Sequence, residues 1–335
     1  MQLLFIALLG AGVSGCGGCA RSDGGTTDAD RYTHARFVRR VFPDPPTELF
    51  GVRGLSIDST GALHILDSED YRIYVLNGSE VRGSTGRKGS GPGEFPDTPV
   101  YMDSGRKGVL VTVGGSHSRA AFFSNEPAYA GTFSPGSLVL QAVHAPFDRI
   151  VASTLNSPTD PVLFDRQGRE LMRLELGNDG DTIMDHFIMD AGTAANGRAL
   201  LVVGYHFRNR VQVVDLDSGE VMADFAIHGL PPTADTRPNP SLRLFPEGQR
   251  PASVPMALPT TTLIQNILVR GDRIYIHLRD HTTYRGREIH EVSLDGALQR
   301  IIVLPEPAFA VEISAGGLIY ATADTATVVN LYAVD

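Results

Sequence analysis

The sequence predicts an all-β fold, a six-bladed β-propeller made of four-stranded antiparallel blades. Three observations favour this fold. Apolar and polar residues alternate with a period of two in short stretches, similar units recur at intervals of about 45 residues, and 36 glycines with 21 prolines supply many turns. An interval of this length is typical of one propeller blade. We therefore expect one ring of blades rather than a layered α/β domain.

The first unit begins at Gly54 and shows the pattern of one blade. The stretches GLSID, ALHILD and RIYVL alternate apolar and polar residues, and Asn77-Gly78, a strong hairpin signal, precedes a fourth stretch, SEVRG. These stretches predict four antiparallel strands. The same pattern returns in five later units, which begin at Val100, Leu138, His186, Ile264 and Phe309.

The last unit ends at Asp335 after only three predicted strands. The segment from His34 to Phe42 has the composition of a strand. We expect this N-terminal strand to complete the last blade, because closing the ring in this way hides an exposed sheet edge.

The linker between the first two units is rich in glycine. It reads GSTGRKGSGPGEF over residues 83–95 and fits neither the spacing of a phosphate-binding P-loop nor that of a dinucleotide-binding loop. Its glycines suit a tight path between blades, and Phe95 is predicted to be buried between them. Arg87 and Lys88 are candidates for contact with an anionic ligand on the rim.

Residues 51–103 resemble NHL-type repeats and the six-bladed propeller lipoproteins related to them. The resemblance rests on the G-x-G-x-G-x-F linker from Gly89 to Phe95 and on a D-x-x-x-x-R-I stretch from Asp67 to Ile73. The absence of Trp argues against a WD-type propeller. Arginines recur before the third strand of several units and are expected to bind carboxylates or carbonyl groups between blades: Arg72, Arg119, Arg210 and Arg287.

The N-terminal segment predicts export. Residues 1–15 contain no charge and read as a signal peptide, and Val13-Ser14-Gly15-Cys16 resembles a bacterial lipobox in which Cys16 carries the lipid. Cys19 is an alternative lipidation site, and a signal without lipid is a further one. Residues 16–30 are predicted to be a flexible tether and residues 31–335 the propeller, with an insertion at 229–262 that is either a lid or a disordered loop. The expected location is the bacterial cell envelope, on the periplasmic or outer-membrane side.

Histidines and carboxylates near one face of the ring are the candidate binding residues. His117, His206 and His281 fall in loops between the second and third strands, where three imidazoles could hold a divalent cation, although ordinary exposed histidines explain them as well. Asp185 and His186 precede the fourth unit and are candidate ligand contacts. Resemblance to gluconolactonase-like propellers would imply a cation at the channel mouth, for which further candidates are Glu48, Asp97 and Glu306.

The functional prediction is a binding or scaffolding propeller that presents one face to a protein, a peptide or a glycan in the cell envelope. A formal charge of −9 argues against nucleic acid as a partner. No nucleophile motif is present in the sequence, and no cofactor is expected beyond a possible divalent cation. The alternatives are a metal-dependent hydrolase or lyase with its site at the channel mouth, and a purely structural envelope protein.

Overall fold

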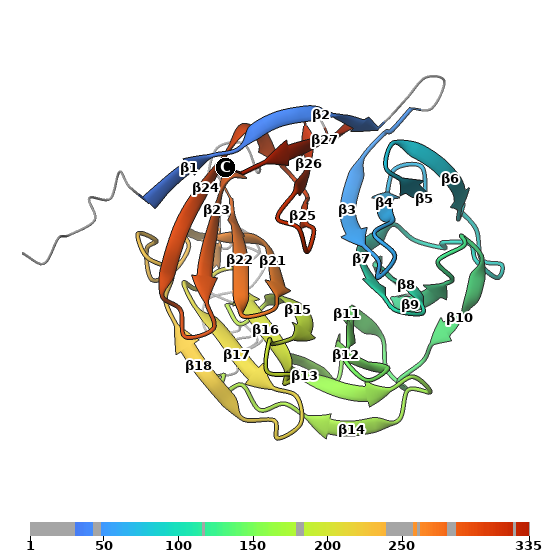
Figure 1. Ribbon diagram of the computed structural model, residues 1–335. Coiled ribbons are helices and arrows are strands. Elements are labelled where there is room, and N and C mark those ends of the chain that lie inside the picture. The colour runs from blue at the N-terminus through green and yellow to red at the C-terminus, as the bar shows by residue number, and fades with distance from the viewer. Residues whose placement is uncertain are drawn as a thin grey trace, which may run out of the picture.

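The computed structural model describes residues 31–42, 48–115, 118–178, 184–238, 257–259, 262–279, 286–323 and 326–334. These residues form a ring of six antiparallel blades around a central axis (Figure 1). The predicted six-bladed propeller is therefore confirmed. Among the described residues, none belongs to a helix of the length and hydropathy that a membrane span requires.

The first four blades are each built from four consecutive strands, ordered from the axis outward. Blade one contains β3 (Val52–Ile57), β4 (Leu63–Asp67), β5 (Arg72–Asn77) and β6 (Glu80–Thr85). Blade two contains β7 (Pro99–Gly105), β8 (Gly108–Val113), β9 (Arg119–Phe123) and β10 (Tyr129–Phe133). Blade three contains β11 (Val139–Ala145), β12 (Arg149–Thr154), β13 (Ser157–Asp165) and β14 (Glu170–Arg173). Blade four contains β15 (Phe187–Thr193), β16 (Ala199–Tyr205), β17 (Val211–Asp215) and β18 (Val221–Phe225).

The last two blades both receive a strand from the N-terminal segment. Blade five contains β21 (Ile264–Arg270), β22 (Arg273–Leu278), β23 (Gly286–Ser293) and β24 (Leu298–Ala308), with β1 (Tyr32–His34) added in parallel to β24. Blade six contains β25 (Val311–Ile313), β26 (Ile319–Ala323) and β27 (Val328–Ala333), with β2 (Arg36–Phe42) added in antiparallel to β27. The predicted closure of the last blade by an N-terminal strand is confirmed. His34 was expected in that strand but lies in β1 of blade five.

The chain passes from blade five to blade six at Ala35. This residue is buried, and its N–H donates to the carbonyl of Val303 on β24 at 2.9 Å. Residues 32–42 thus add one strand to blade five and one strand to blade six, and so join these two adjacent blades. The parallel strand β1 was not predicted, because three residues of mixed burial leave no period in the sequence.

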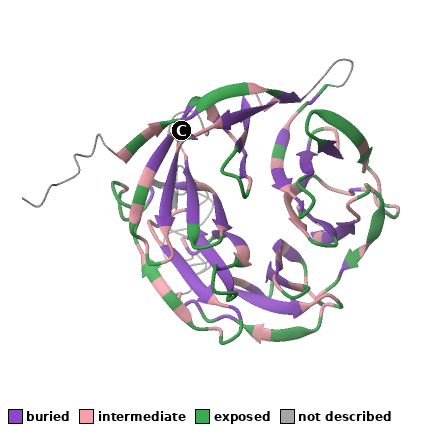
Figure 2. Ribbon diagram, in the orientation of Figure 1, coloured by how far each residue is buried: buried purple, intermediate pink, exposed green. Residues whose placement is uncertain are grey.

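The core is divided among the six blade interfaces. Six clusters of buried apolar side chains each contain residues from two neighbouring blades. Strands in the middle of a blade are buried on both faces, as in β16, where all seven residues are buried. The outer strand β18 alternates between partly buried and exposed residues, so the outer edge of the ring faces solvent (Figure 2).

The glycine-rich linker follows the predicted path from β6 to β7. Phe95 is 0% exposed and its ring lies 5.6 Å from that of Phe123 in the next blade, which confirms its predicted burial between blades. Gly86 has a φ of 92° and lies against the Phe95 ring, so a side chain there would collide with it. The Glu94 carboxylate accepts from the Gly91 N–H at 2.8 Å and closes the loop.

Two of the recurring arginines bind carbonyl groups between blades, as predicted. Arg119 donates to the Glu94 carbonyl at 3.2 Å, and Arg210 donates to the Leu176 carbonyl at 3.4 Å as well as to Asp224. Arg72 instead pairs with Asp70 of its own blade at 3.1 Å.

The insertion after blade four is described only at its two ends. The strands β19 (Thr236–Pro238) and β20 (Ala257–Pro259) pair in antiparallel, and the remainder between and after them, residues 239–256 and 260–261, lies outside the described residues. Ala234 is buried, and its N–H donates to the carbonyl of Phe207 in blade four at 2.9 Å. The start of the insertion therefore packs on the loop that connects β16 and β17.

Candidate functional site

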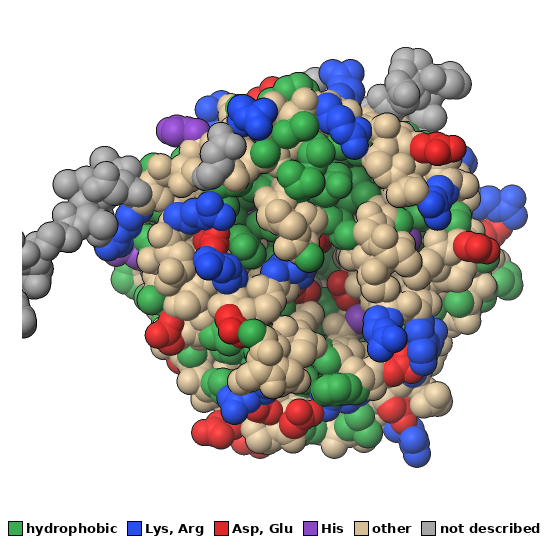
Figure 3. Space-filling model, in the orientation of Figure 1, with side chains coloured by type: hydrophobic (Ala, Val, Ile, Leu, Met, Phe, Trp, Pro, Cys, Tyr) green, Lys and Arg blue, Asp and Glu red, His purple; other side chains and the backbone are tan. Residues whose placement is uncertain are grey.

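A cavity of about 390 Å³ lies on the axis of the ring. The inner strands of all six blades line it, namely β3, β7, β11, β15, β21 and β25. The space-filling view shows the centre of the ring hollowed, with acidic and basic side chains in the hollow (Figure 3). A volume of this size suits a small ligand or one side chain of a larger ligand.

Polar side chains on the inner strands tie each blade to the next. In five successive pairs of blades, a side chain on one inner strand forms a hydrogen bond with the backbone of the following inner strand. The bonds are Ser104 N–H to Ser56 Oγ (2.9 Å), His144 N–H to Asp103 Oδ2 (2.6 Å), Gln141 Nε2 to Met189 O (3.3 Å), Val269 N–H to Asp190 Oδ2 (2.8 Å) and Asn266 Nδ2 to Val311 O (2.9 Å). Much of the polarity of the channel wall is therefore structural.

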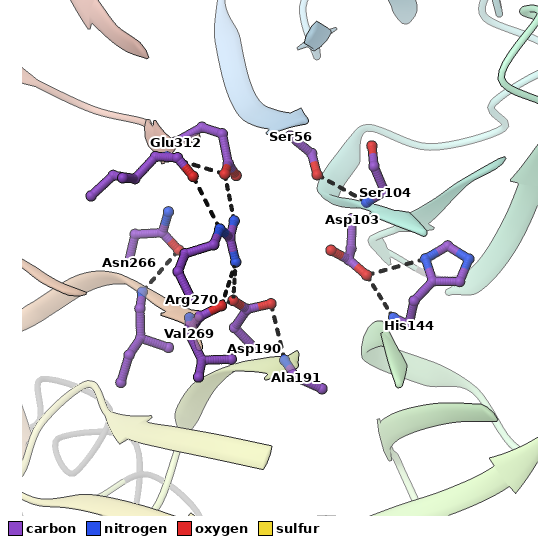
Figure 4. A network of polar contacts seen from close by, with 12 residues as sticks. Ser56, Asp103, Ser104, His144, Asp190, Ala191, Asn266, Val269, Arg270 and Glu312 are labelled. Carbon is purple, nitrogen blue, oxygen red and sulfur yellow. Dashed lines mark hydrogen bonds and ion pairs between the residues drawn. The ribbon is translucent and has the colours of Figure 1, made fainter. Parts of the chain in front are cut away.

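Arg270 lies at the centre of a charged cluster at one end of the cavity (Figure 4). Its guanidinium group binds the Asp190 carboxylate at 3.0 Å, the Glu312 carboxylate, and the Ile313 carbonyl at 3.0 Å. The three side chains come from blades four, five and six, so the cluster joins three inner strands.

Burial shifts the pKa values of this cluster. Burial raises the pKa of Asp190 to about 6, against the attraction of Arg270, and repulsion by Asp103 adds to the rise. Burial likewise raises the pKa of Glu312 to about 7. Burial alone would lower the pKa of Arg270, but the attraction of Glu312 and Asp190 raises it. The guanidinium group therefore stays charged while its partners hold protons more readily than usual.

Asp103 faces this cluster from the other side of the channel (Figure 4). One carboxylate oxygen accepts from the His144 backbone and lies 3.1 Å from His144 Nδ1, and the side chain is 19% exposed. The other oxygen points away from His144 toward the channel. This end of the cavity thus contains three carboxylates and one guanidinium group.

Imidazole and guanidinium groups line the opposite end, where the inner strands begin. The rings of His186 and His206 stack at 5.0 Å, and Arg279 donates to Thr262 at 2.7 Å. His206 is buried, and its Nδ1 lies 2.9 Å from the Ile264 carbonyl. Burial, with the neighbouring His186, lowers the pKa of His206 to about 4, so this ring is neutral at physiological pH.

The structure brings two of the candidate binding residues from the sequence to the cavity. His186 and His206 line it, whereas Asp185 is fully buried beside it and pairs with Arg208 at 3.1 Å. Arg87 and Lys88 lie in the linker outside the cavity. There Arg87 binds Glu94 at 2.6 Å, and the Lys88 ammonium group lies 5.3 Å from the centre of the Tyr71 ring.

His117 and His281 lie outside the described residues, as does Cys16. Within the part of the chain that the structure describes, no three His, Cys, Asp or Glu side chains come close enough together to hold a metal ion.

Sequence reasoning missed the charged cluster. Asp103, Asp190, Arg270 and Glu312 each stand in an inner strand next to apolar residues, in the stretches VYMDS, FIMDA, ILVRG and AVEIS. A charged residue within a short apolar strand is the signal that could have found them, because burying a charge is costly unless it is paired. These four positions are far apart in the sequence, and only the closed ring brings them together.

No family model matches the sequence, and no curated protein matches it. Solved structures are similar in fold. The structure of U3-55K has a TM-score of 0.56 at 10% identity and covers 90% of this chain and 99% of that chain. The WD40 propeller domain of Doa1 has a TM-score of 0.48 at 12% identity, with coverage of 84% and 78%, and the Cps50 (Swd1) propeller domain from Myceliophteria thermophila has 0.48 at 11%, with 87% and 86%. These likenesses concern the fold alone.

Proposed function

We propose that this protein is a binding propeller of the cell envelope, which receives part of a protein, peptide or glycan ligand in its central channel. The observation that carries the proposal is the axial cavity of about 390 Å³, to which every blade contributes. Ligand pockets combine apolar walls with a few placed polar groups, and this cavity has both.

The polar groups of the channel favour binding over catalysis. Asp190 and Glu312 are held by Arg270 and by backbone N–H groups, and the neutral ring of His206 is held by a backbone carbonyl. Groups fixed in this way are suited to recognition of a ligand by shape and charge. The alternative of a metal-dependent hydrolase or lyase gains no support from the described residues, among which no set of three ligands converges.

The N-terminal segment supports a location in the envelope. The uncharged residues 1–15 end within the lipobox-like Val13-Ser14-Gly15-Cys16, and the resemblance to NHL-type propeller lipoproteins agrees with lipid attachment at Cys16. Mass spectrometry of the mature N-terminus tests this part of the proposal. A lipid-modified Cys16 supports it. A chain that still begins at Met1 overturns it, whereas a chain that is cleaved but carries no lipid overturns only the lipid anchor.

The channel is tested by blocking it. Gln265 lines the cavity and is half-buried, so Gln265→Trp should fill the channel with a ring. Gln299→Trp places the same side chain on the exposed face of the outer strand β24 and serves as the control. Binding of the labelled full-length chain to arrays of synthetic peptides and of glycans is the measurement.

We expect Gln265→Trp to lose array binding and Gln299→Trp to keep it. Binding that survives Gln265→Trp but is lost in Arg87→Ala would place the ligand on the rim and overturn the channel site.

A further inference from the structure

The cavity contains hydrogen-bond acceptors that no described residue satisfies. Gln141 on β11 is only 5% exposed and lines the cavity. Its Nε2 donates to the Met189 carbonyl at 3.3 Å, which fixes the orientation of the amide group. Its Oε1 is buried and has no partner among the described residues. A buried acceptor without a donor is costly, so this oxygen is suited to receive a donor from a ligand.

A second acceptor lies on the neighbouring inner strand. Asp103 uses one carboxylate oxygen to bind His144, and no described residue donates to the other, which faces the channel. Asp103 and Gln141 belong to adjacent blades, whose inner strands are joined by the same Asp103–His144 contact. Both residues line the same cavity.

The charge at this end favours a cation. Asp103, Asp190 and Glu312 face one another with Arg270 as the single guanidinium group among them. Two carboxylates are bound to Arg270, and Asp103 is not. An entering positive charge would offset the surplus of negative charge, whereas an anion would add to it.

The apolar wall of the cavity favours a cation that is carried on an aliphatic chain. Met102, Ala142, Val143, Ile188 and Leu268 line the same cavity and offer contact to an aliphatic chain. A bare metal ion would need several ligands around it, and no group of three occurs in the described parts of the chain. A primary ammonium group has three donors and can be carried on a thin aliphatic stem.

We propose that the central channel binds a primary ammonium group on an aliphatic stem, with Asp103 and the Gln141 carbonyl oxygen as its acceptors. This chemistry occurs at the end of a lysine side chain and in free alkyl diamines. The inference rests on the proposed channel site and adds the class of ligand.

The buried carboxylates supply an independent signature. Asp190 is faced by Arg270 from β21, Glu312 from β25 and Asp103 from β7, and His144 from β11 lies on Asp103. A cation near Asp103 lowers the pKa of both Asp190 and Glu312, because it favours their charged forms. Binding near pH 6.5 should therefore release protons, which titration calorimetry in buffers of different ionisation enthalpy detects.

The test is titration calorimetry on the full-length chain in detergent with three probes. They are the acetylated tripeptide amide Gly-Lys-Gly, the same tripeptide with norleucine in place of lysine, and 1,5-diaminopentane. We expect the lysine peptide or the diamine to bind and the norleucine peptide to bind at least about tenfold more weakly, because it lacks the charged donor. Preference for the peptide identifies a peptide side chain as the source, and preference for the diamine identifies a free amine. Either supports the proposal.

The variants locate the site. Asp103→Asn keeps an oxygen for the His144 N–H but removes the charge, and we expect about a tenfold loss of affinity for the amine. Gln141→Leu removes the amide oxygen and should also weaken binding. Asp217→Asn and Gln299→Leu make the same changes on the outside of the ring and should leave affinity unchanged.

Two results would overturn the proposal. One is equal affinity for the lysine and norleucine peptides, and the other is unchanged affinity in Asp103→Asn. If no amine binds while array binding is still lost in Gln265→Trp, the channel site stands and only the class of ligand is wrong. If amines bind equally well to Gln265→Trp, the channel site itself is wrong.

Discussion

Single glycines decide whether the linker between blades one and two can take its path. Gly86 has positive φ and a close neighbour on each side. A Cβ atom there would lie 2.5 Å from Cε2 of Phe95 and 2.7 Å from the Tyr71 carbonyl oxygen. Gly61 has a similar φ of 85°, but a Cβ atom there would meet nothing within 4 Å. A comparison of alanine substitutions at the two positions therefore separates the cost of backbone strain from the cost of steric collision.

We expect Gly86→Ala to lower the free energy of unfolding by about 2 kcal/mol more than Gly61→Ala does. Gly61→Ala should cost about 1 kcal/mol, the strain of a left-handed backbone at a residue with a side chain. Urea denaturation followed by circular dichroism measures both. Equal losses of unfolding free energy in the two variants would show that the Phe95 ring can move aside without an energetic cost.

Residues of the linker were predictable, and residues of the channel were not. Phe95 ends the seven-residue glycine pattern that begins at Gly89, so its burial between blades could be predicted from the neighbouring residues alone. From each member of the set Asp103, Asp190, Arg270 and Glu312 to the next, the separation in the chain is 87, 80 and 42 residues, which is one or two blades. Their cluster depends on the angular position of each blade around the ring, and no local pattern encodes that position.

Among the strands, β2 is the one that closes the ring. It covers the edge of β27 and carries Val41 and Phe42 into the interface between blades six and one. Phe42 is 0% exposed and its ring lies 5.3 Å from that of Tyr74 in blade one, whereas Phe37 on the same strand is 51% exposed. The strand composition of residues 34–42, and not an alternation of exposed and buried residues, made this strand recognisable in the sequence.

We expect Phe42→Ala to cost about 3–5 kcal/mol of unfolding free energy, because it removes a large buried ring from the interface that closes the propeller. Phe37→Ala, the matched change on the same strand, should cost less than about 1 kcal/mol. Thermal and urea unfolding of both variants give the comparison. Similar losses would mean that β2 acts through its backbone pairing and not through this side chain.

β1 shows the limit of element prediction. It pairs in parallel with a strand that follows it by more than 260 residues, over only three residues. In a hairpin such as that at Asn77-Gly78, the turn residues in the sequence indicate which two strands pair. A short parallel strand is not joined to its partner by a tight turn, so the sequence contains no comparable indication of the pairing.

For the molecule as a whole, buried titratable groups set how stability depends on pH. Burial lowers the pKa of His206 and of His277 to about 4 and also lowers the pKa of His64 and His290. The native state therefore binds fewer protons than the unfolded chain between about pH 4 and 6.5, so stability is lost as the pH falls. Asp190 and Glu312 act in the opposite sense. Their raised pKa values make the native state bind more protons, so their contribution is lost as the pH rises through about 6 and 7.

We expect the unfolding free energy to rise with pH up to about pH 7.5, because the histidines of the unfolded chain, with a pKa of 6.5, are still partly protonated below that value. Glu312 opposes this rise, since its contribution should fall by about 1 kcal/mol between pH 6.5 and 8.5. Glu312→Gln should remove this contribution, so the unfolding free energy of the variant relative to the unaltered chain should increase by about 1 kcal/mol over this range, as measured by urea denaturation from pH 5 to pH 8.5. A difference that stays constant with pH would show that Glu312 does not titrate in this range.

The pairing of β2 with β27 has a consequence for the order of events during synthesis. Arg36 is opposite Ala333, so the strand that leaves the ribosome among the first must wait for a partner made roughly 300 residues later. Each of the six apolar clusters needs two neighbouring blades, and the cluster at the closing interface needs β2 as well. The ring therefore cannot close while the chain is still being made. Until the last strand has emerged, the edge of β2 and the side chain of Phe42 therefore lack their partners in blade six.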